Sequence, residues 1–591
     1  MKKTFGFLLV ICMVLSCNTG RYKDKFIQYS PVILTQEEKI ALSKSLDGLQ
    51  SRYYDESAKM ITEEIEGYSY HIDAQSGLFH AVRRSFSYAV RLLDLGDKNY
   101  QKRAFDIIEK TISLQDTVKN SPSCGVWPYY LEEPLATKKS PVDYNWADFN
   151  GVHLLDVYLG HQKEIPANLK HLIRNSIILA ARSIQKRNVN LDYTNIAIMG
   201  TYVTYMTSHL FDLPDMRDYA NKRLKKFYEF TLKEGGFPEY NSPTYTFVAL
   251  NELDRMKRHI IEPDSKAMID SLYNIGWNVI ARHYHKPTGQ WTGPHSRSYN
   301  SIIDPSFYSI LNQASDGKIE SGQFIMPADI KIRHKIPTYL LHYFLTPNYP
   351  RTEFDTFESI EPKITGTTYM TNKYAISSAN RSSLWNERRP FLVYWGNKTN
   401  PHYLQVRFLH DFYDFSSASF FCEQKDNYIL AAINFITNGG DKHINIDLIK
   451  NGKLIAKDLR LRLEFGNCND PGNLNLPKNK NELFSLKLDS IVFSFQLYSS
   501  IFDNYKGTWE KGGDGKSSWI DFVIYSGSER EIDLKKIDEA VLGFTFSAGT
   551  ELDKIASNKP SVIIKNQMMK VKWNDMNLSV PVKPGLQPKN L

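Results

Sequence analysis

Cysteine is scarce in this chain of 591 residues, and only Cys124, Cys422 and Cys468 follow the first twenty positions. An odd number of widely spaced cysteines excludes a disulfide framework and a cysteine-ligated zinc site, although one disulfide stays open. After residue 17, no apolar run approaches the roughly 20 residues that a membrane helix needs. Long lysine or arginine blocks are also absent, and the formal net charge of +8 is mild. We therefore expect no nucleic-acid partner.

The motifs of several enzyme classes are missing as well. The sequence has no His-Glu-x-x-His, Gly-x-Ser-x-Gly, Walker or Rossmann glycine pattern. Zinc proteases, serine hydrolases and nucleotide-binding enzymes therefore lack their usual signals. We expect no cofactor to be required. His283, His285 and His295 are close in sequence but form no clean ligand set, which leaves a structural divalent metal ion open.

The first 17 residues have the features of an export signal. Basic Met1-Lys2-Lys3 precedes an apolar run from Phe5 to Leu15, and Ser16-Cys17 follows. This ending resembles a bacterial lipoprotein lipobox, which implies cleavage and lipid attachment at Cys17. An ordinary signal peptide cut near Asn18 is the alternative. We expect an exported protein held in the cell envelope, on the periplasmic side or the outer-membrane surface, through its N-terminal lipid alone.

Hydrophobic periodicity divides the rest of the chain into two domains. From Thr35, where Glu38 completes a capping box, apolar residues recur at helical spacing. Helix follows helix without a sequence repeat of the solenoid kind, which favours a closed α/α toroid over residues 18–360. The expected helices are 77–95, 99–115, 146–160, 166–187, 193–210, 214–234, 243–259, 264–284, and one after Pro327 through Leu345.

Short β-branched and aromatic runs replace the helical pattern in residues 361–591. Asn451-Gly452 lies between two such runs and is a typical hairpin turn. Many short strands joined by turns indicate a sandwich. The predicted fold class is therefore multidomain α+β, with an N-terminal (α/α) toroid followed by a C-terminal antiparallel β-sandwich.

Two polar loops of the helical half contain most of the candidate chemistry, Glu239–Tyr245 and Gly293–Tyr299. Ser242 and Pro243 are typical of an N-cap and a first helical residue, so a helix is expected to begin here with its positive end facing the loop. Such an end favours a bound anion such as a carboxylate. In the second loop His295, Arg297 and Tyr299 alternate, so an extended backbone would project them from one face.

The predicted architecture resembles the polysaccharide lyases of the heparinase, alginate lyase and hyaluronate lyase type. The motif support comes from residues 368–378 and Trp385–Pro390, which are similar to the opening strands of the heparinase-like sandwich. The resemblance implies a cleft across the toroid, partly roofed by the sandwich. It also implies β-elimination in a uronic-acid glycan, which leaves an unsaturated uronate end, with an acidic polysaccharide or oligosaccharide as the substrate.

Such a lyase needs a group that neutralises the substrate carboxylate, a base, and an acid for the leaving oxygen. We assign Asn241 and Arg297 to the carboxylate, and Tyr245 and His295 to proton transfer, with Tyr299 as an alternate. An unperturbed tyrosine titrates near pH 10, so a tyrosine base needs a nearby cation, for which Arg297 is the candidate. Each of these residues also has a structural interpretation. Tyr245 could belong to the hydrophobic core, His295 could be an ordinary loop histidine, and Arg297 could cap the C-terminus of a helix.

Further substrate-binding candidates lie in the same half. Glu239 could bind sugar hydroxyls or orient His295. The others are Asn195, Asn150, His153, Trp127 and Trp291, each of which also has a structural interpretation. Two other functions stay open: a glycoside hydrolase that uses Glu239 and Asp148, and a non-catalytic surface glycan-binding lipoprotein. The polar loops offer one acid against several tyrosine, histidine and arginine residues, which favours the lyase.

Overall fold

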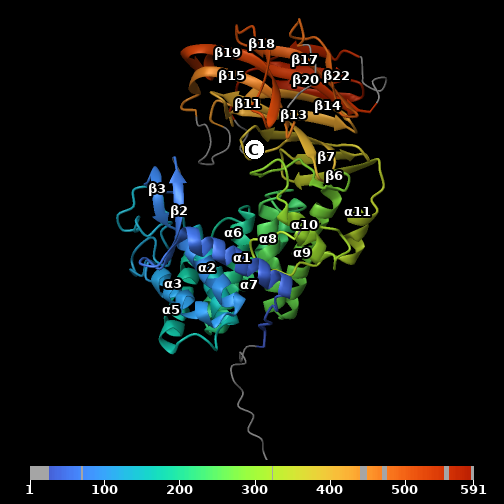
Figure 1. Ribbon diagram of the computed structural model, residues 1–591. Coiled ribbons are helices and arrows are strands. Elements are labelled where there is room, and N and C mark those ends of the chain that lie inside the picture. Colours follow the sequence, from blue (N-terminus) through green and yellow to red (C-terminus); the bar gives the residue numbers. More distant parts are fainter. Residues whose placement is uncertain are drawn as a thin grey trace, which may run out of the picture.

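The computed structural model describes residues 25–67, 71–322, 324–439, 449–468, 476–550 and 558–586. Most helices come first along the chain and the large antiparallel sheets second, and Figure 1 shows the large sheets above the helices. The predicted fold class, an N-terminal α/α toroid followed by an antiparallel β-sandwich, is confirmed. The predicted signal segment 1–17, with Cys17, lies outside the described residues. Within the described part of the chain, no helix is both long and apolar enough to cross a bilayer.

The toroid is built from helical hairpins in two layers. Its helices are α1 (Gln36–Tyr53), α2 (Val82–Leu95), α3 (Lys98–Ile112), α4 (Asn145–Gly160), α5 (Ala167–Arg187), α6 (Thr194–Leu210), α7 (Pro214–Glu234), α8 (Tyr245–His259), α9 (Pro263–His283) and α10 (Ser306–Ala314). Helices α2, α4, α6 and α8 contact one another in succession and form the inner layer, while α3, α5, α7 and α9 pack outside them. Helix α6 is buried all round from Thr194 to His209, as expected of an enclosed helix.

Glycines allow α4 and α6 to approach each other closely. A Cβ atom on Gly200 would lie 2.6 Å from Asp148 Oδ1, and one on Gly151 would lie 3.0 Å from Val203 Cγ1. Any larger residue would therefore force the two inner helices apart, because packed interiors have little free volume.

Capping explains two of the predicted helix starts. Thr35 and Glu38 form the expected capping box at α1, with reciprocal bonds of 3.2 and 2.8 Å. At α8 the helix begins at Tyr245, two residues after the predicted start, and Ser242 Oγ accepts a hydrogen bond from Tyr245 N at 3.0 Å. The same hydroxyl donates to the backbone oxygen of Arg297 at 2.6 Å, so the cap also joins the two polar loops.

The helical half contains a small sheet that the periodicity did not predict. It consists of β1 (Tyr54–Asp55), β2 (Met60–Glu66) and β3 (Ser76–His80), so the helix expected from residue 77 begins only at Val82. The helix expected after Pro327 is also wrong. Only η1 (Thr338–Leu340) and α11 (Leu341–Leu345) are helical there, and the residues before them make a turn at 330–331, where Ile330 and Ile332 are buried.

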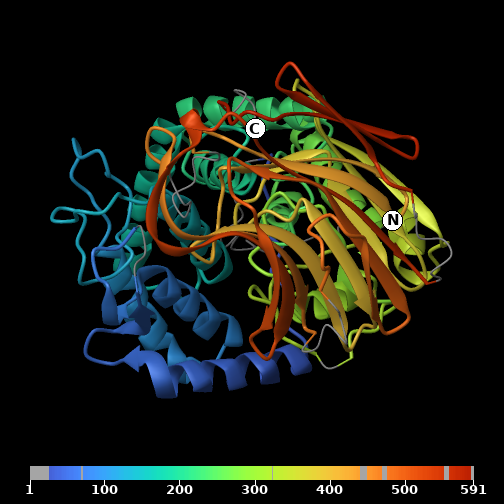
Figure 2. The same cartoon turned by 90° about the horizontal axis from the view of Figure 1, so that it is seen from above.

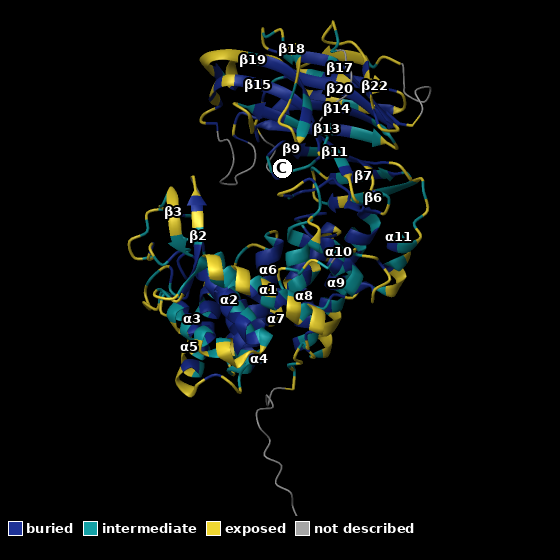
Figure 3. Ribbon diagram, viewed as in Figure 1, coloured by how far each residue is buried: buried dark blue, intermediate teal, exposed yellow. Residues whose placement is uncertain are grey.

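Two antiparallel sheets form the sandwich and enclose its core, which is dark blue in Figure 3. The strand orders are β18-β19-β15-β11-β10-β8-β7-β6, with β12 beside β11, and β16-β17-β20-β14-β13-β9; a third sheet has the order β21-β22-β23. The strands are β6 (Arg351–Glu358), β7 (Ile364–Met370), β8 (Ala375–Ala379), β9 (Arg381–Ser383), β10 (Phe391–Gly396), β11 (Pro401–His410), β12 (Tyr413–Asp414), β13 (Ala418–Lys425), β14 (Tyr428–Phe435), β15 (Lys453–Gly466), β16 (Phe484–Leu488), β17 (Ile491–Phe502), β18 (Thr508–Gly513), β19 (Ser517–Asp533), β20 (Ala540–Gly549), β21 (Ser561–Lys565), β22 (Met568–Trp573) and β23 (Met576–Pro581).

The predicted Asn451-Gly452 turn has φ values of 56° and 79°, as a type I′ hairpin turn requires. Strand β15 follows it, whereas the run expected before it, residues 444–448, lies outside the described residues. Seen from above in Figure 2, the sandwich covers the later helices and leaves the early, blue helices uncovered.

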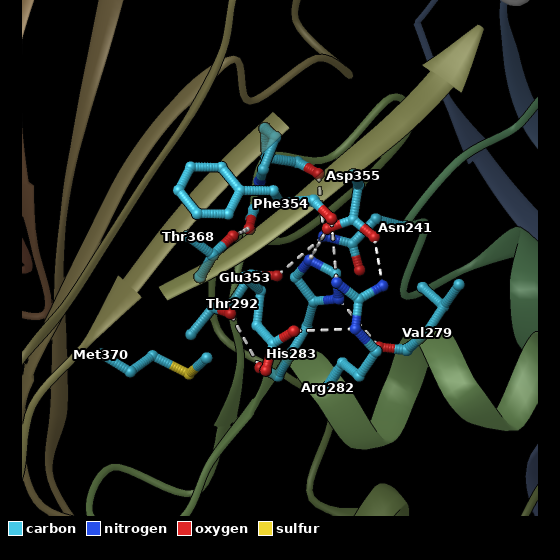
Figure 4. Close-up of polar contacts among 12 residues, drawn as sticks. Asn241, Val279, Arg282, His283, Thr292, Glu353, Phe354, Asp355, Thr368 and Met370 are labelled. Atoms are coloured by element: carbon cyan, nitrogen blue, oxygen red, sulfur yellow. Dashed lines mark hydrogen bonds and ion pairs between the residues drawn. The ribbon is translucent and has the colours of Figure 1, made fainter. Parts of the chain in front are cut away.

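The end of α9 joins the toroid to the first strand of the sandwich. Arg282 Nε and Nη1 bind the carboxylates of Glu353 at 2.8 Å and Asp355 at 2.5 Å, and Nη2 donates to Phe354 O at 3.0 Å (Figure 4). Strand β6 begins at Arg351 and pairs with β7, so the large sheet starts before the predicted division at 360/361. The predicted boundary lies too late because β6 belongs to this sheet.

Candidate active site

The two polar loops predicted from the sequence meet in the structure. The first precedes α8, and the second follows β5 (Gln290–Trp291). Asn241 Nδ2 donates to the backbone oxygens of Thr292 and Pro294, both at 2.9 Å, and Trp291 Nε1 donates to Asn241 Oδ1 at 2.5 Å. Asn241 thus lies at the centre of the junction between the loops, close to the interdomain contacts drawn in Figure 4.

These bonds correct the roles predicted for Asn241 and His295. The Asn241 side chain is buried, and both of its polar atoms are bonded within the protein, so it holds the loops together instead of binding a substrate carboxylate. His295 is only 1% exposed, and its Nδ1 lies 2.6 Å from the backbone oxygen of Asn241. Burial lowers the pKa of His295 to about 3, so the ring is neutral and enclosed. It is not placed for proton transfer to a substrate.

Arg297 is the centre of the polar cluster. Its Nε donates to Glu387 Oε2 at 2.6 Å and its Nη2 donates to the Tyr245 hydroxyl oxygen at 3.0 Å. Nη1 lies 3.7 Å from Glu239 Oε1. The guanidinium is also held between two rings, 4.7 Å from the centroid of Tyr245 and 4.8 Å from that of Trp385. Stacking and charge-assisted bonds together fix this cation in one orientation.

Tyr245 and Tyr299 form a hydrogen-bonded pair beside Arg297. Their hydroxyl oxygens are 2.5 Å apart. Tyr299 is 58% exposed, whereas Tyr245 is half-buried behind it. Burial raises the pKa of Tyr245 above 10, while the positive charge of Arg297 acts in the opposite direction. The pair therefore connects an accessible phenol to a fixed cation, and at Tyr245 the effect of burial on the pKa is larger than the opposing effect of Arg297.

Glu239 lies on the other side of Arg297. It is buried, and its Oε2 accepts a hydrogen bond from the backbone N–H of Asn195 at 3.3 Å. Burial raises the pKa of Glu239 to about 7 against the opposing effect of Arg297, so the carboxyl is partly protonated at neutral pH. Among the described residues, Glu239 pairs with Arg297 and not with His295, so the orienting role predicted for it is wrong.

Glu387 and Trp385 lie between β9 and β10 of the sandwich and are not among the residues predicted from the sequence. Their loop reaches the helical domain through Ser298 N, which donates to Glu387 O at 2.7 Å, and through a backbone bridge between His295 and Arg389. The only signal was that both residues fall in the heparinase-like segment. No local rule pairs Glu387 with an arginine 90 positions earlier.

The remaining predicted residues divide into two groups. Trp127 and Trp291 are 1% exposed core residues whose indole N–H groups are bonded within the protein, so the predicted sugar-stacking role is wrong for both. Asn195 is 3% exposed and Asn150 is fully buried, so neither presents its amide at an open surface. His153 differs, because its ring lines a cavity.

Two adjoining cavities follow α8 away from the tyrosine pair, and Val248 lines both. The larger, of about 500 Å³, lies between α2, α4 and α8 and is called the α2–α4 cavity below. The smaller, of about 270 Å³, is lined mainly by apolar side chains such as Phe247 and Phe307. Tyr245, Val248 and Glu252 occupy successive turns of one helix face, so the larger cavity continues the surface that carries Tyr245.

The three histidines considered for a metal ion have separate partners. Nδ1 of His285 lies 2.8 Å from Thr288 Oγ1, and its Nε2 lies 2.7 Å from the backbone oxygen of Thr371. Nε2 of His283 faces Asp355 at 3.2 Å. In the described parts of the chain, no group of histidine, cysteine, aspartate or glutamate residues is arranged to hold a metal ion. Cys124, Cys422 and Cys468 are free thiols.

Comparison with known proteins gives a family model and several solved structures. A model described as a domain of unknown function, DUF8769, matches residues 44–338. No curated protein matches the chain.

Among solved structures, a heparinase III is 9% identical with a TM-score of 0.47, and the match covers 93% of this chain and 92% of that one. A chondroitin AC lyase of Streptomyces coelicolor A3, in complex with chondroitin sulphate, is 8% identical with a TM-score of 0.47, covering 92% and 84%. A mutant of the heparan sulfate lyase HepC of Pedobacter heparinus is 9% identical with a TM-score of 0.40, covering 93% and 90%. These matches assign no residue roles, so the chemistry must come from the site itself.

Proposed function

We propose that this protein is a polysaccharide lyase that cleaves a uronic-acid glycan by β-elimination. The observation that carries the proposal is the tyrosine pair itself: Tyr245 and Tyr299 share a 2.5 Å contact, and Arg297 donates to the Tyr245 oxygen. Elimination needs a base that takes the proton next to the carboxylate and an acid that protonates the leaving oxygen. Two linked phenols beside a fixed cation can do both.

In this mechanism the pair first gives one proton to solvent water through the exposed Tyr299, and the resulting tyrosinate is stabilised by Arg297 and by the second phenol. It accepts the proton from the carbon next to the uronate carboxylate. The bond from C4 to the leaving oxygen then breaks, a carbon–carbon double bond forms, and the leaving oxygen takes a proton back from the pair. The pair is then again the tyrosinate that began the elimination, and no other reactant is needed.

Glu239 is the proposed partner of the substrate carboxylate. With a pKa near 7 it is available as a neutral O–H donor, and Arg297 lies beside it. Both groups reduce the negative charge that opposes loss of the neighbouring proton. Glu239 thus takes the role that was predicted for Asn241.

A glycoside hydrolase is the second candidate, because Asp148 also has a pKa raised to about 7 by burial. A hydrolase needs one carboxyl group as acid and another, ionised, as base or nucleophile. Asp148 is only 1% exposed and, like Glu239, is not held in its ionised form, so this chemistry has weaker support.

The deciding experiment measures the ultraviolet absorbance of an unsaturated uronate when residues 18–591 act on a panel of acidic polysaccharides. We expect an absorbance rise with at least one substrate, and a fall in kcat of at least about a hundredfold in Tyr245→Phe and Tyr299→Phe. Tyr339→Phe changes an equally exposed tyrosine of η1 and serves as the matched control. Reducing ends without absorbance would instead support the hydrolase, and binding without any product would support a glycan-binding protein.

We also propose that the enzyme is exported and anchored by a lipid on Cys17, on the basis of the basic, apolar and Ser-Cys segments at its N-terminus. Metabolic labelling with a radioactive fatty acid tests this directly. The wild-type protein is expected to carry label and to sediment with membranes, and Cys17→Ser is expected to lose the label. Labelling that persists in Cys17→Ser would refute the anchor.

A further inference from the structure

The strongest feature outside the tyrosine cluster is a cation in the α2–α4 cavity. Arg83, the second residue of α2, lines this cavity and lies 3.6 Å from the ring centroid of Phe149. No carboxylate, carbonyl or other acceptor among the described residues bonds to its guanidinium. A largely buried arginine without a hydrogen-bonded partner is unusual, because desolvating an unpaired charge is costly.

The other charges around the cavity are paired. Arg84 lies 3.6 Å from Glu63, and Arg255 binds both Glu252 and Asp329. His153 adds no charge, because burial lowers its pKa to about 4. Arg83 is therefore the cation of this cavity to which no described carboxylate is hydrogen-bonded, and Asp143 and Glu252 act on it only at longer range.

Two further properties make the cavity suited to an acidic sugar. Tyr129 and Trp146 stack with their ring centroids 4.0 Å apart, and both line the cavity beside Arg83, which supplies flat apolar surface next to a cation. The N-terminal end of α2 also faces the cavity through Ala81, and the partial positive charge of a helix start adds to that of Arg83.

We infer that the α2–α4 cavity is a second subsite that binds an anionic substituent of the glycan, with Arg83 as its main ligand. This inference rests on the proposed function, because it assumes that an acidic glycan is the substrate. Tyr245 and Glu252 are seven residues apart on α8, which is about 10 Å along the helix axis. The anionic group at Arg83 therefore belongs to a sugar that is not part of the cleaved linkage. Only a chain long enough to reach from Tyr245 to Arg83 can make this contact, so Arg83 favours longer acidic chains.

The test compares three tetrasaccharides by calorimetric titration: a uronate tetrasaccharide without sulfate, one with sulfate esters, and a neutral glucose tetrasaccharide. Arg83→Gln is expected to weaken binding of one or both acidic ligands about tenfold to a hundredfold, the range for losing a hydrogen bond to a charged group. The neutral ligand should be unaffected. Loss with both acidic ligands identifies a carboxylate as the bound group, and loss with the sulfated ligand alone identifies a sulfate ester.

Arg174→Gln is the matched control, because Arg174 on α5 also stacks on a phenylalanine, 5.1 Å from the ring of Phe211, but lies on an outer helix. Arg83→Lys keeps the charge and should recover part of the affinity. A normal circular dichroism spectrum and melting temperature would show that Arg83→Gln is folded.

The two proposals fail in different ways. If Arg83→Gln binds every ligand within about twofold of wild type, the subsite is refuted, whether or not wild-type protein releases unsaturated product. If wild type releases no such product but its acidic-ligand affinity depends on Arg83, the subsite stands and the lyase reaction does not. If wild-type protein binds neither acidic tetrasaccharide, the subsite is refuted as well.

Discussion

Replacing Glu239 with glutamine tests the electrostatics of the site without any substrate. The pKa of Glu239 rises from the ordinary 4.5 to about 7 because the carboxyl is buried. Below pH 4.5 the group is protonated in both the folded and the unfolded protein. As the pH rises from 4.5 to about 7, the unfolded chain loses this proton while the folded protein keeps it, so the folded protein loses stability. The loss amounts to about 3 kcal/mol above about pH 7.

A glutamine side chain cannot ionise, so the Glu239→Gln variant should lack this loss. Arg297 keeps its bond to Glu387 in the variant and is not left unpaired. We therefore expect the unfolding free energy of Glu239→Gln, relative to wild type, to increase by up to about 3 kcal/mol between about pH 4 and pH 8. Urea titrations followed by tryptophan fluorescence at several pH values measure this difference.

Glu229→Gln removes a mostly exposed carboxylate of α7 and should follow the wild-type pH dependence. A Glu239→Gln difference that stays constant with pH, or that decreases as the pH rises, would refute a raised pKa for Glu239. It would also remove the basis for using Glu239 as a neutral donor to the substrate carboxylate.

Three further outcomes follow from the geometry. Arg297→Lys keeps the charge but cannot bind Glu387 and Tyr245 as one planar fork, so kcat should fall about a hundredfold in the ultraviolet assay. Gly200→Ala places a Cβ 2.6 Å from an inner-helix carboxylate and should reduce stability by about 1–3 kcal/mol in thermal denaturation, unlike Gly236→Ala, which meets no atom within 4 Å. Arg282→Ala removes charge-assisted bonds to two acids of β6, which keep Arg351 and His283 beside them, and should cost about 1.5–3 kcal/mol in the same measurement.

Much of the fold could be predicted because its elements show clear periodicity. The α4 to α9 series and the strands of the sandwich follow apolar spacings that depend only on neighbouring residues. The secondary-structure predictions failed in short segments whose conformation is determined by the strand or helix that they pack against. Strand β2 is defined by pairing with β3, and residues 327–337 form a turn and irregular backbone whose isoleucines Ile330 and Ile336 are buried against the helices.

The candidate site could be predicted only in part. Both polar loops were found, and Tyr245, Arg297, Tyr299 and Glu239 do come together. Asn241 and His295 are also polar residues of these two loops, yet their side chains are buried in the protein. Their bonding to backbone oxygens depends on how one loop folds over the other, which spacing in the sequence does not specify.

The backbone bridge between His295 and Arg389 has a consequence for engineering the protein. The loop that carries Arg297 pairs through its backbone with a loop of the sandwich. The carboxylate that binds Arg297 is Glu387, which lies on that sandwich loop. A helical domain expressed without residues beyond 345 would retain both tyrosines but would lack the carboxylate and the indole ring that hold the arginine. A chimera with a foreign sandwich would need to keep residues 385–389, because these positions hold Arg297 and the loop of the helical domain that carries it.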